Sequence, residues 1–260
     1  MILLNADDPP PVILERRLGR SIFVLTVDHA GARIPSRLGD LGVSRDELER
    51  HIAWDIGCLG LARRLAADLD APLVAQRYSR LVIDCNRVPG VSTSIPTTAD
   101  GVVIPGNLDL REAEIAARTA EIFAPYHACL DRILDERVGA RRPTILIALH
   151  TMTDVFQGVQ RKMHAAVLHH RDRRFAALML ELLRQETDVI AADNDPYVVE
   201  DTHYTIPHHA ERRAIPCVAL EIRQDLVTAE VGQAEWARRL GAALRAAEQS
   251  WTHATRGECV

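Results

Sequence analysis

Seven short apolar runs are spaced along the chain, and most are separated by longer stretches in which apolar residues recur every three or four positions. Short unbroken apolar runs are typical of strands buried on both faces, and the longer period is typical of amphipathic helices. The pattern predicts strands at residues 22–26, 71–76, 80–85, 144–149, 165–168, 189–192 and 217–220, and helices at 44–51, 55–69, 110–137, 173–185 and 229–249. Since strands that alternate with helices form right-handed crossovers, we expect one α/β domain over residues 1–260, with a mainly parallel or mixed twisted sheet and helices on both faces.

Local signals refine the predicted helices. Ser44 and Glu47 form the Ser-x-x-Glu pattern of a capping box, which predicts that the first short helix begins there. Pro125 lies inside the longest helical pattern and predicts a kink, because proline has no N–H group to donate. Arg118 falls on the polar side of the same pattern, so we expect its side chain in solvent.

Three stretches show neither the apolar runs of strands nor the repeat of amphipathic helices. Residues 1–20 contain a run of prolines and are expected to form a leader segment. Residues 88–107 are rich in Pro, Gly, Ser and Thr, and residues 193–213 are equally irregular. Because long irregular stretches inside a compact domain are usually lids or binding loops, we expect both to be active-site loops.

Composition and charge exclude several classes of function. The net charge of -5 gives no electrostatic reason to expect a nucleic acid or an anionic membrane as partner. No apolar run reaches the roughly 18 residues that a membrane helix needs. The 5 cysteines are scattered without a CxxC pair, which suggests neither a disulfide framework nor a thiolate zinc site. We therefore expect a soluble cytoplasmic protein that acts on a small molecule; the sequence does not indicate its oligomeric state.

Reactive side chains follow three of the predicted strands. His29, His150 and Glu221 each come just after an apolar run. In open α/β sheets ligands bind at the carboxyl ends of strands, so we expect these side chains at one site. Two neutral imidazoles with one carboxylate form a common catalytic zinc set that leaves a position open for water. His29 and His150 are therefore candidate metal ligands, although Glu221 could instead pair with Arg223.

The carboxylate of the metal set has three candidates. Asp28 is adjacent to His29, but neighbouring side chains on a strand point to opposite faces. Asp55 begins the next predicted helix, where an aspartate could equally serve as the N-cap. Asp154 lies four residues after His150. Spacing alone leaves the choice open.

Several longer segments carry a resemblance to a known family. They resemble, in the expected order from about residue 27 to 226, the signature blocks of the N-formylglutamate amidohydrolases: DHAGARIP, HIAWDIG, YSRLVIDCNR, TSIPTTADGVVIPGN, LHTMTD, NDPYVVEDTHYT and LEIRQDL. The resemblance implies a fold like that of the zinc carboxypeptidases and of aspartoacylase and succinylglutamate desuccinylase. It also implies zinc-dependent hydrolysis of N-formyl-L-glutamate to formate and L-glutamate, with another divalent metal as an alternative, and a place in histidine degradation.

The resemblance assigns roles residue by residue. The segment from Asp84 to Arg87 matches the Asp-x-Asn-Arg motif of these fold-related zinc enzymes, in which Asn86 and Arg87 would hold a substrate carboxylate. His150 matches the second zinc histidine, and Glu221 matches the general base. Further substrate-binding residues that it suggests are Arg80, Arg223, Tyr197 and His209.

The first zinc motif departs from the His-x-x-Glu pattern of the fold-related zinc enzymes. After His29 come Ala30, Gly31, Ala32 and Arg33, so the glutamate is missing. We interpret residues 31–54 as an insertion before the helix that presents the acidic ligand, which makes Asp55 its equivalent.

Two other functions fit the same residues. One is a deacylase of the same fold that acts on a different N-acyl amino acid. The other is a small-molecule-binding module without catalysis. The second is disfavoured because both histidines, the Asn-Arg pair and Glu221 are all present.

Overall fold

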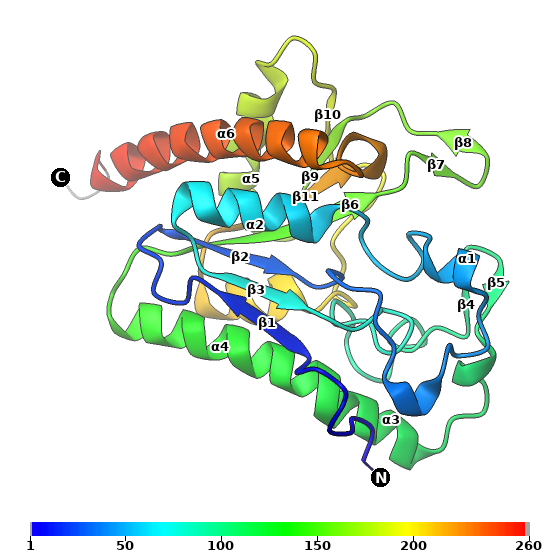
Figure 1. The fold of residues 1–260 in the computed structure, drawn as a ribbon. Coiled ribbons are helices and arrows are strands. Elements are labelled where there is room, and N and C mark those ends of the chain that lie inside the picture. The colour runs from blue at the N-terminus through cyan, green and yellow to red at the C-terminus, as the bar shows by residue number, and fades with distance from the viewer. Residues whose placement is uncertain (1, 258–260) are drawn as a thin grey trace.

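A seven-stranded mixed sheet forms the centre of the structure, a computed structural model that describes residues 2–257 (Figure 1). Its strand order is β1-β3-β2-β6-β11-β9-β10. The strands are β1 Val12–Glu15, β2 Phe23–Val27, β3 Leu73–Gln76, β6 Ile145–Met152, β9 Ala165–Leu168, β10 Ala191–Asp193 and β11 Cys217–Arg223. Two small hairpins lie outside this sheet: β4 Thr98–Ala99 with β5 Val102–Val103, and β7 Val155–Phe156 with β8 Val159–Gln160.

Strand pairing is parallel through the middle of the sheet. β3, β2, β6 and β11 run parallel to one another, whereas β1 is antiparallel to β3 and β9 is antiparallel to β11. The carboxyl ends of β2, β6 and β11 therefore meet at one edge. The predicted single-domain α/β fold with a mixed sheet is confirmed.

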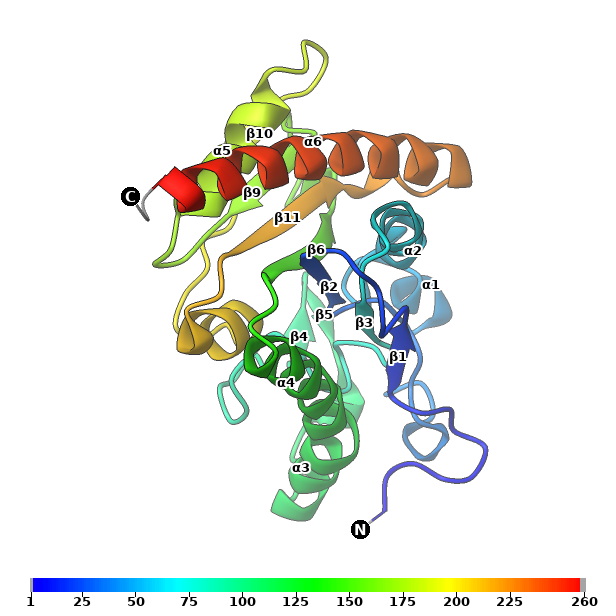
Figure 2. The ribbon, with the colours of Figure 1, turned by 90° about the vertical axis from the view of Figure 1, so that its left-hand side faces the viewer.

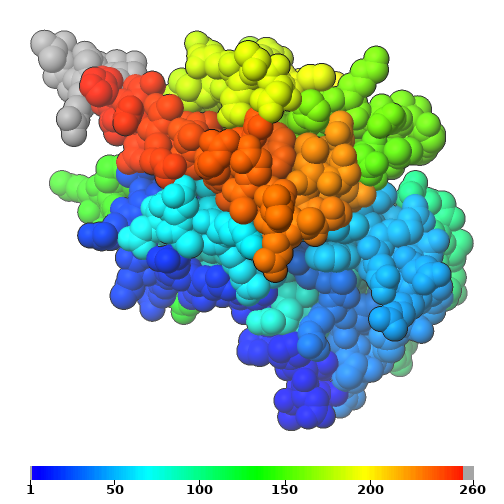
Figure 3. All heavy atoms as spheres, turned by 45° about the horizontal axis from the view of Figure 1, so that its top comes forward, coloured from blue at the N-terminus to red at the C-terminus, as the bar shows by residue number. Residues whose placement is uncertain are grey.

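Helices cover both faces of the sheet (Figure 2). They are α1 Arg45–Leu48, α2 Cys58–Leu69, α3 Glu112–Arg118, α4 Ala124–Gly139, α5 Arg174–Arg184 and α6 Glu230–Gly257. On one face α6 packs against α2 and α5, and Figure 3 shows α6 in orange and red beside α2 in cyan. On the other face α4 packs against β3 and β1. Because both faces are covered, β2, β3, β6 and β9 are buried along their whole length, as their unbroken apolar runs predict.

The predicted leader segment is an integral part of the fold. β1 lies within it and pairs with the outer edge of β3. Leu3 is buried, and the backbone N–H groups of Leu3 and Leu4 donate hydrogen bonds to the carboxylate of Glu121. Within the domain, the expected leader segment therefore closes the edge of the sheet.

Residues 80–85 do not form the predicted strand. Leu81, Val82 and Ile83 are buried in the core, but the segment is a series of turns in which Val82 N–H donates to the carbonyl of Ser79. The strand that precedes the segment, β3, has β1 on one side and β2 on the other. Residues 81–83 are apolar because they are buried in the core. They cannot add a strand next to β3, because β1 and β2 already occupy both of its edges.

The long helical pattern is interrupted as predicted. A π-helical turn at Thr119–Phe123 separates α3 from α4, and Pro125 lies in the first turn of α4. The prediction that the Arg118 side chain lies in solvent is wrong, because this side chain is only 1% exposed. Its guanidinium donates to the carbonyl oxygens of Val82 and Gly106 and to the side chain of Asn107, so it holds residues 80–85 and 105–107 together.

The first short helix is capped as predicted, because the Ser44 side chain accepts a hydrogen bond from the Glu47 N–H. Within residues 2–257, none of the helices combines the length and apolar character that crossing a membrane requires.

Candidate active site

The ends of β2, β6 and β11 place three predicted residues around one cleft of ≈ 150 Å³. His29 follows β2 by two residues, and His150 lies near the end of β6. Glu221 lies directly beside His150 in the parallel register of β11 and β6. All three side chains line the cleft, so the expectation that the strand ends meet at one site is confirmed.

Asp55 reaches the same place from the segment before α2. The N-cap of α2 is Gly57, and no side chain caps this helix, so Asp55 does not serve as the cap that its position also suggested. The Asp55 backbone N–H donates to the His29 carbonyl at 2.8 Å, which holds the two segments together. Gly57 has φ of +78°, and a Cβ there would meet the Val227 carbonyl oxygen at 2.1 Å, so only glycine fits.

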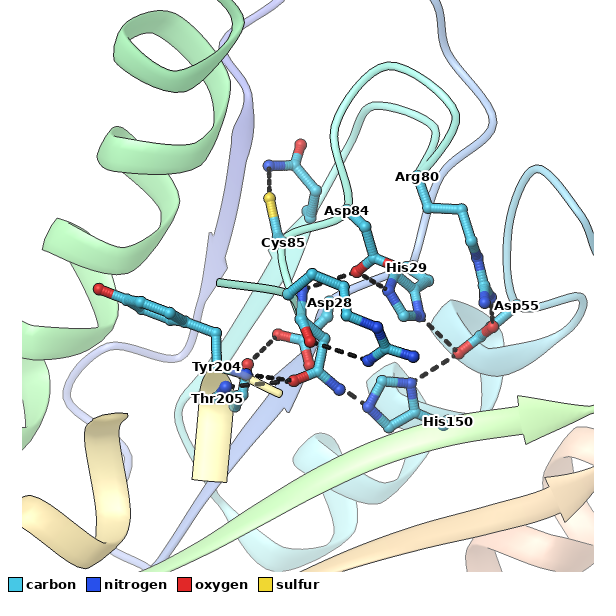
Figure 4. A network of polar contacts seen from close by, with 12 residues as sticks. Asp28, His29, Asp55, Arg80, Asp84, Cys85, His150, Tyr204 and Thr205 are labelled. Atoms are coloured by element: carbon cyan, nitrogen blue, oxygen red, sulfur yellow. Dashed lines mark hydrogen bonds and ion pairs between the residues drawn. The ribbon is translucent and has the colours of Figure 1, made fainter. Parts of the chain in front are cut away.

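His29, Asp55 and His150 form a group that we call the strand-end cluster. Asp55 Oδ2 lies 2.9 Å from His150 Nδ1 and 3.6 Å from His29 Nδ1, and all three residues are buried (Figure 4). One ligand atom from each lies within 4.8 Å of the others. The Nδ1 atom of His29 has no hydrogen-bond partner. Two imidazoles, a carboxylate and an unpartnered nitrogen are suitable for a divalent metal ion such as Zn²⁺.

Each histidine of this cluster has a second carboxylate at its other ring nitrogen. Asp84 Oδ1 lies 2.8 Å from His29 Nε2, and Asp28 Oδ2 lies 3.3 Å from His150 Nε2. The contact between Asp84 and His29 is a hydrogen bond, and carboxylates bonded in this way fix the tautomer and orientation of metal-binding histidines. His150 Nε2 and Asp28 Oδ2 are close but form no hydrogen bond. Asp28 is held in turn by the hydroxyl groups of Tyr126 and Thr205, which both donate to its Oδ1.

The other candidates for the acidic ligand do not lie between the histidines. Asp28 lies behind His150, as described above. Asp154 lies outside the cleft, where its Oδ1 accepts a 3.4 Å hydrogen bond from the Gln224 amide. Of the three aspartates, the structure brings Asp55 between His29 and His150.

Burial and charge shift the ionisation of this site. Burial, followed by the positive charge of Arg80, lowers the pKa of His29 to about 4, so His29 is neutral at pH 7, as a metal ligand must be. Burial alone would lower the pKa of His150, but the contact with Asp28 and the charge of Glu221 outweigh it and raise that pKa. Burial would raise the pKa of the Asp84 carboxyl group, because it disfavours the charged form. The nearby His29 and Arg87 instead hold this pKa well below its usual range. Asp28 and Glu221 therefore favour a positive charge on the His150 ring.

Glu221 is half-buried and faces the cleft. Among the described residues, no hydrogen bond or ion pair engages its carboxylate. Arg223 does not pair with it, because the Arg223 guanidinium binds Asp225 and the carbonyl oxygen of Arg161. Glu221 is thus free to accept a proton from a group in the cleft.

Four of the residues suggested for substrate binding line the cleft: Asn86, Arg87, Arg80 and Tyr197. The Arg80 guanidinium forms an ion pair with Asp55. Asn86 Oδ1 accepts a hydrogen bond from the Thr205 N–H at 3.1 Å, which fixes its side chain. Arg87 forms no ion pair within the described part of the chain, and its Nη1 donates only to the neighbouring Asn86 carbonyl. Its remaining donors are available to a ligand.

Two suggested residues, Arg223 and His209, do not reach the cleft. Arg223 is engaged by Asp225, as described above. His209 is 0% exposed, with its Nδ1 3.0 Å from Asp131 and its Nε2 2.8 Å from His127. Both ring nitrogens of His209 are therefore occupied. His209 belongs to a second group of close metal-ligand types, Asp131, His208 and His209, which we call the distal cluster.

Sequence reasoning missed two histidines of the cleft, His51 and His203. Burial lowers the pKa of each to about 4, helped by the charge of Arg80 for His51 and of Arg87 for His203. Both histidines lie in segments that carry the family resemblance, HIAWDIG and NDPYVVEDTHYT. Their place in these segments is the signal that could have identified them as site residues.

The two irregular segments contribute unequally. Residues 193–213 supply Tyr197, Val199 and His203 to the lining of the cleft. Residues 88–107 supply none of the lining residues within the described chain. Their Asn107 instead accepts a hydrogen bond from Arg118, so this segment supports the fold beside the site.

An α/β fold that collects histidines and carboxylates in a cleft at its strand ends is compatible with a bound metal ion. The chain belongs to the N-formylglutamate amidohydrolase family, whose model matches residues 21–228. The resemblance seen in the sequence is confirmed, and family membership indicates an amidohydrolase that acts on a small molecule. A comparison with curated proteins finds no match.

Solved structures agree with this assignment. The crystal structure of a gene product from Agrobacterium tumefaciens is similar with a TM-score of 0.93 and 36% identity, over 96% of this chain and 99% of that one. The structure of N-formylglutamate amidohydrolase from Ralstonia eutropha is similar with a TM-score of 0.72 and 22% identity, over 93% of this chain and 98% of that one. At 22% identity the second likeness shows the fold alone.

Proposed function

We propose that this chain is a zinc-dependent amidohydrolase that cleaves the amide bond of N-formyl amino acids, with N-formyl-L-glutamate as the substrate that the family's name suggests. The observation that carries the proposal is the convergence of His29, Asp55 and His150 in a cleft, with Glu221 beside His150. The chain thus offers both a set of metal ligands and an unpaired carboxylate.

His29, Asp55 and His150 would hold the ion. The unpartnered Nδ1 of His29 and the carboxylates behind both histidines support this assignment. When bound, a divalent ion supplies Lewis-acid polarisation of the amide carbonyl and a lower pKa for the attacking water. Zn²⁺ is suitable for two imidazoles and one carboxylate, and another divalent ion could replace it.

Glu221 acts as the general base. Its carboxylate accepts a proton from the attacking water and donates it to the nitrogen of the leaving amino acid as the amide bond breaks. The products are formate and the free amino acid. A positioned carboxylate in this role typically contributes 10²–10⁴-fold in rate.

Arg87 and Asn86 hold the α-carboxylate of the substrate. A guanidinium presents two parallel donors to a carboxylate, and Arg87 has donors to spare. Residues of the 193–213 segment cover the cleft and keep bulk water from the reacting amide. Orientation by these groups brings the amide carbonyl toward the strand-end cluster and Glu221.

A single experiment tests the proposal. Purified protein is treated with a chelator, dialysed, and assayed for release of formate from N-formyl amino acids before and after Zn²⁺ is added back. We expect activity to disappear with the metal and to return with it. Full activity in protein that analysis shows to be metal-free would refute the metal's role.

A second candidate is a deacylase for an N-acyl amino acid other than N-formyl-L-glutamate. The observation that favours it is that the described part of the chain places a single unpaired guanidinium in the cleft, whereas glutamate carries two carboxylates.

A further inference from the structure

Among residues 2–257, one free cationic side chain lines the cleft. Arg80 and Arg87 are the arginines that line it, and no lysine does. Arg80 is engaged by Asp55, whereas Arg87 has no carboxylate partner in residues 2–257. His51 and His203 also line the cleft, but at pH 7 both are neutral because burial lowers their pKa to about 4. One free guanidinium is sufficient for one substrate carboxylate.

The nearest further arginines are used by the fold. Arg161 is buried, and its guanidinium donates to the carbonyl of Thr153 and to the hydroxyl of Tyr197. Arg223 is held by Asp225. Neither can turn to a ligand without breaking these contacts. A second carboxylate in the cleft would therefore lose its hydration without gaining a charged partner, which is unfavourable.

One part of the cleft is apolar, and the hydroxyl groups of the three threonines that also line the cleft already donate to Ile56, Val155 and Asp28. Ala148 lies two residues before His150 on β6, and Ala219 lies two residues before Glu221 on β11, so both point to the same face as the site. Leu168 on β9 pairs with Ala219 in register. These three residues form an apolar floor next to the proposed catalytic groups.

The 193–213 segment closes this part of the cleft with further apolar groups. Val199 is 6% exposed and Ile206 is 3% exposed, and both line the cleft. The neighbouring Val198 points the other way, since it is 54% exposed. The subsite thus has an apolar floor and an apolar cover.

We propose that this subsite, formed by Ala148, Ala219, Leu168, Val199 and Ile206, binds an apolar substrate side chain, so that the enzyme prefers N-formyl amino acids with one carboxylate, such as N-formyl-L-leucine, to N-formyl-L-glutamate. The inference rests on the proposed function, because it assumes that the cleft hydrolyses N-formyl amino acids. It departs from the substrate that the family's name suggests. The reason is that Arg87 would hold the α-carboxylate and leave the γ-carboxylate of glutamate in apolar surroundings.

The test compares kcat/KM for N-formyl-L-leucine, N-formyl-L-glutamate and N-formylglycine with zinc-loaded enzyme. We expect the leucine compound to exceed the glutamate compound by at least about 10-fold, since apolar contacts of this size discriminate by 10-fold or more. Equal or better hydrolysis of N-formyl-L-glutamate would overturn the inference and leave the proposed function standing. Hydrolysis of none of the three would overturn the proposed function itself.

A matched pair of variants locates the preference in the structure. Val199→Ala removes two methyl groups from the subsite, whereas Val198→Ala removes them from the exposed side of the same segment. For Val199→Ala we expect the ratio of kcat/KM for N-formyl-L-leucine to that for N-formylglycine to fall about 10-fold. For Val198→Ala we expect the wild-type ratio. Equal ratios in both variants would contradict the placement of the side chain.

Binding can be measured apart from turnover. In the Glu221→Gln variant, calorimetric titration should give a Kd for N-formyl-L-leucine at least about 10-fold lower than for N-formyl-L-glutamate. The reverse order of affinity would overturn the inference.

Discussion

The strand-end cluster and the distal cluster contain the same residue types at the same close spacing, but their surroundings differ. His29, Asp55 and His150 in one, and Asp131, His208 and His209 in the other, each bring three ligand atoms within 4.8 Å. In the strand-end cluster a ring nitrogen of His29 lacks a partner and the residues face a cleft. In the distal cluster both ring nitrogens of His209 are engaged, and none of the three residues lines the cleft.

Charge separates the two clusters further. Asp131 is paired with Arg213 at 2.6 Å, and the ring of His208 lies 3.1 Å from the guanidinium of Arg212. Two arginines at the distal cluster already supply the positive charge that a metal ion would bring. The strand-end cluster has Asp28, Asp84 and Glu221 around it, with Arg80 as the one opposing charge at Asp55. Proximity of ligand types thus defines a metal site only where nitrogens, charge and space remain available.

The largest expected effect comes from the base. Glu221→Gln keeps the size of the side chain but cannot accept the proton, so we expect kcat to fall about 10²–10⁴-fold while bound metal stays at the wild-type amount. The control is Glu211→Gln, because Glu211 binds His170 outside the cleft, and its kcat should match the wild type. Wild-type turnover by Glu221→Gln would show that Glu221 is structural.

Two arginines provide the next comparison. Arg87→Ala removes charged hydrogen bonds to the substrate carboxylate, worth about 1.5–3 kcal/mol, so we expect kcat/KM for N-formyl amino acids to fall about 10- to 150-fold. Arg223→Ala removes an arginine that faces Asp225 and should change kcat/KM little, although it should lower stability. The same loss in both variants would contradict the assignment of Arg87 to the substrate carboxylate.

Zinc affinity should respond differently when the carboxylate that contacts a histidine is changed in each of the two clusters. Asp84→Asn weakens the support of His29, and we expect zinc affinity to fall about 10- to 100-fold in a competition assay with a coloured chelator. Asp131→Asn makes the matching change beside His209 and should leave zinc affinity unchanged. If Asp131→Asn weakened zinc binding as much as Asp84→Asn, the metal would not be specific to the strand-end cluster.

The smallest expected effect concerns pH and the histidine beside the distal cluster. Burial, followed by the charge of His209, lowers the pKa of His127 from 6.5 to about 3, so below pH 6.5 the unfolded chain binds a proton that the folded chain refuses. The stabilisation from neutral His127 is therefore complete above pH 6.5 and is lost as the pH falls toward 3. His127→Gln removes this titration.

Urea unfolding at pH 7, 6 and 5 measures the consequence. We expect the stability difference between wild type and His127→Gln to narrow as the pH falls, by at most about 1.4 kcal/mol per pH unit, the value for one proton. A difference that stays constant over this range would show that His127 is not held neutral.

The features that the sequence predicted correctly depend on local patterns. His29, His150 and Glu221 could be found because each follows an apolar run, and parallel strands bring such positions to one edge. Spacing left Asp55 as one of three candidate aspartates, because its approach to His150 depends on how the segment before α2 folds back.

The predictions that failed concern contacts between distant segments. Residues 80–85 have the composition of a strand, but β1 and β2 already occupy both edges of β3. Arg118 looks like a surface residue until the carbonyl groups of Val82 and Gly106 are placed next to it. Arg223 and His209 match the family segments, but their partners Asp225 and Asp131 turn them away from the cleft.

The central claim is that the strand-end cluster, and not the distal cluster, binds the metal. Metal analysis of purified wild-type protein, His150→Ala and His208→Ala after zinc loading and dialysis tests it most directly, with circular dichroism to confirm that each is folded. The account predicts one zinc ion per chain in the wild type and in His208→Ala, and none in His150→Ala. Zinc retained by folded His150→Ala, or lost from folded His208→Ala, would contradict it.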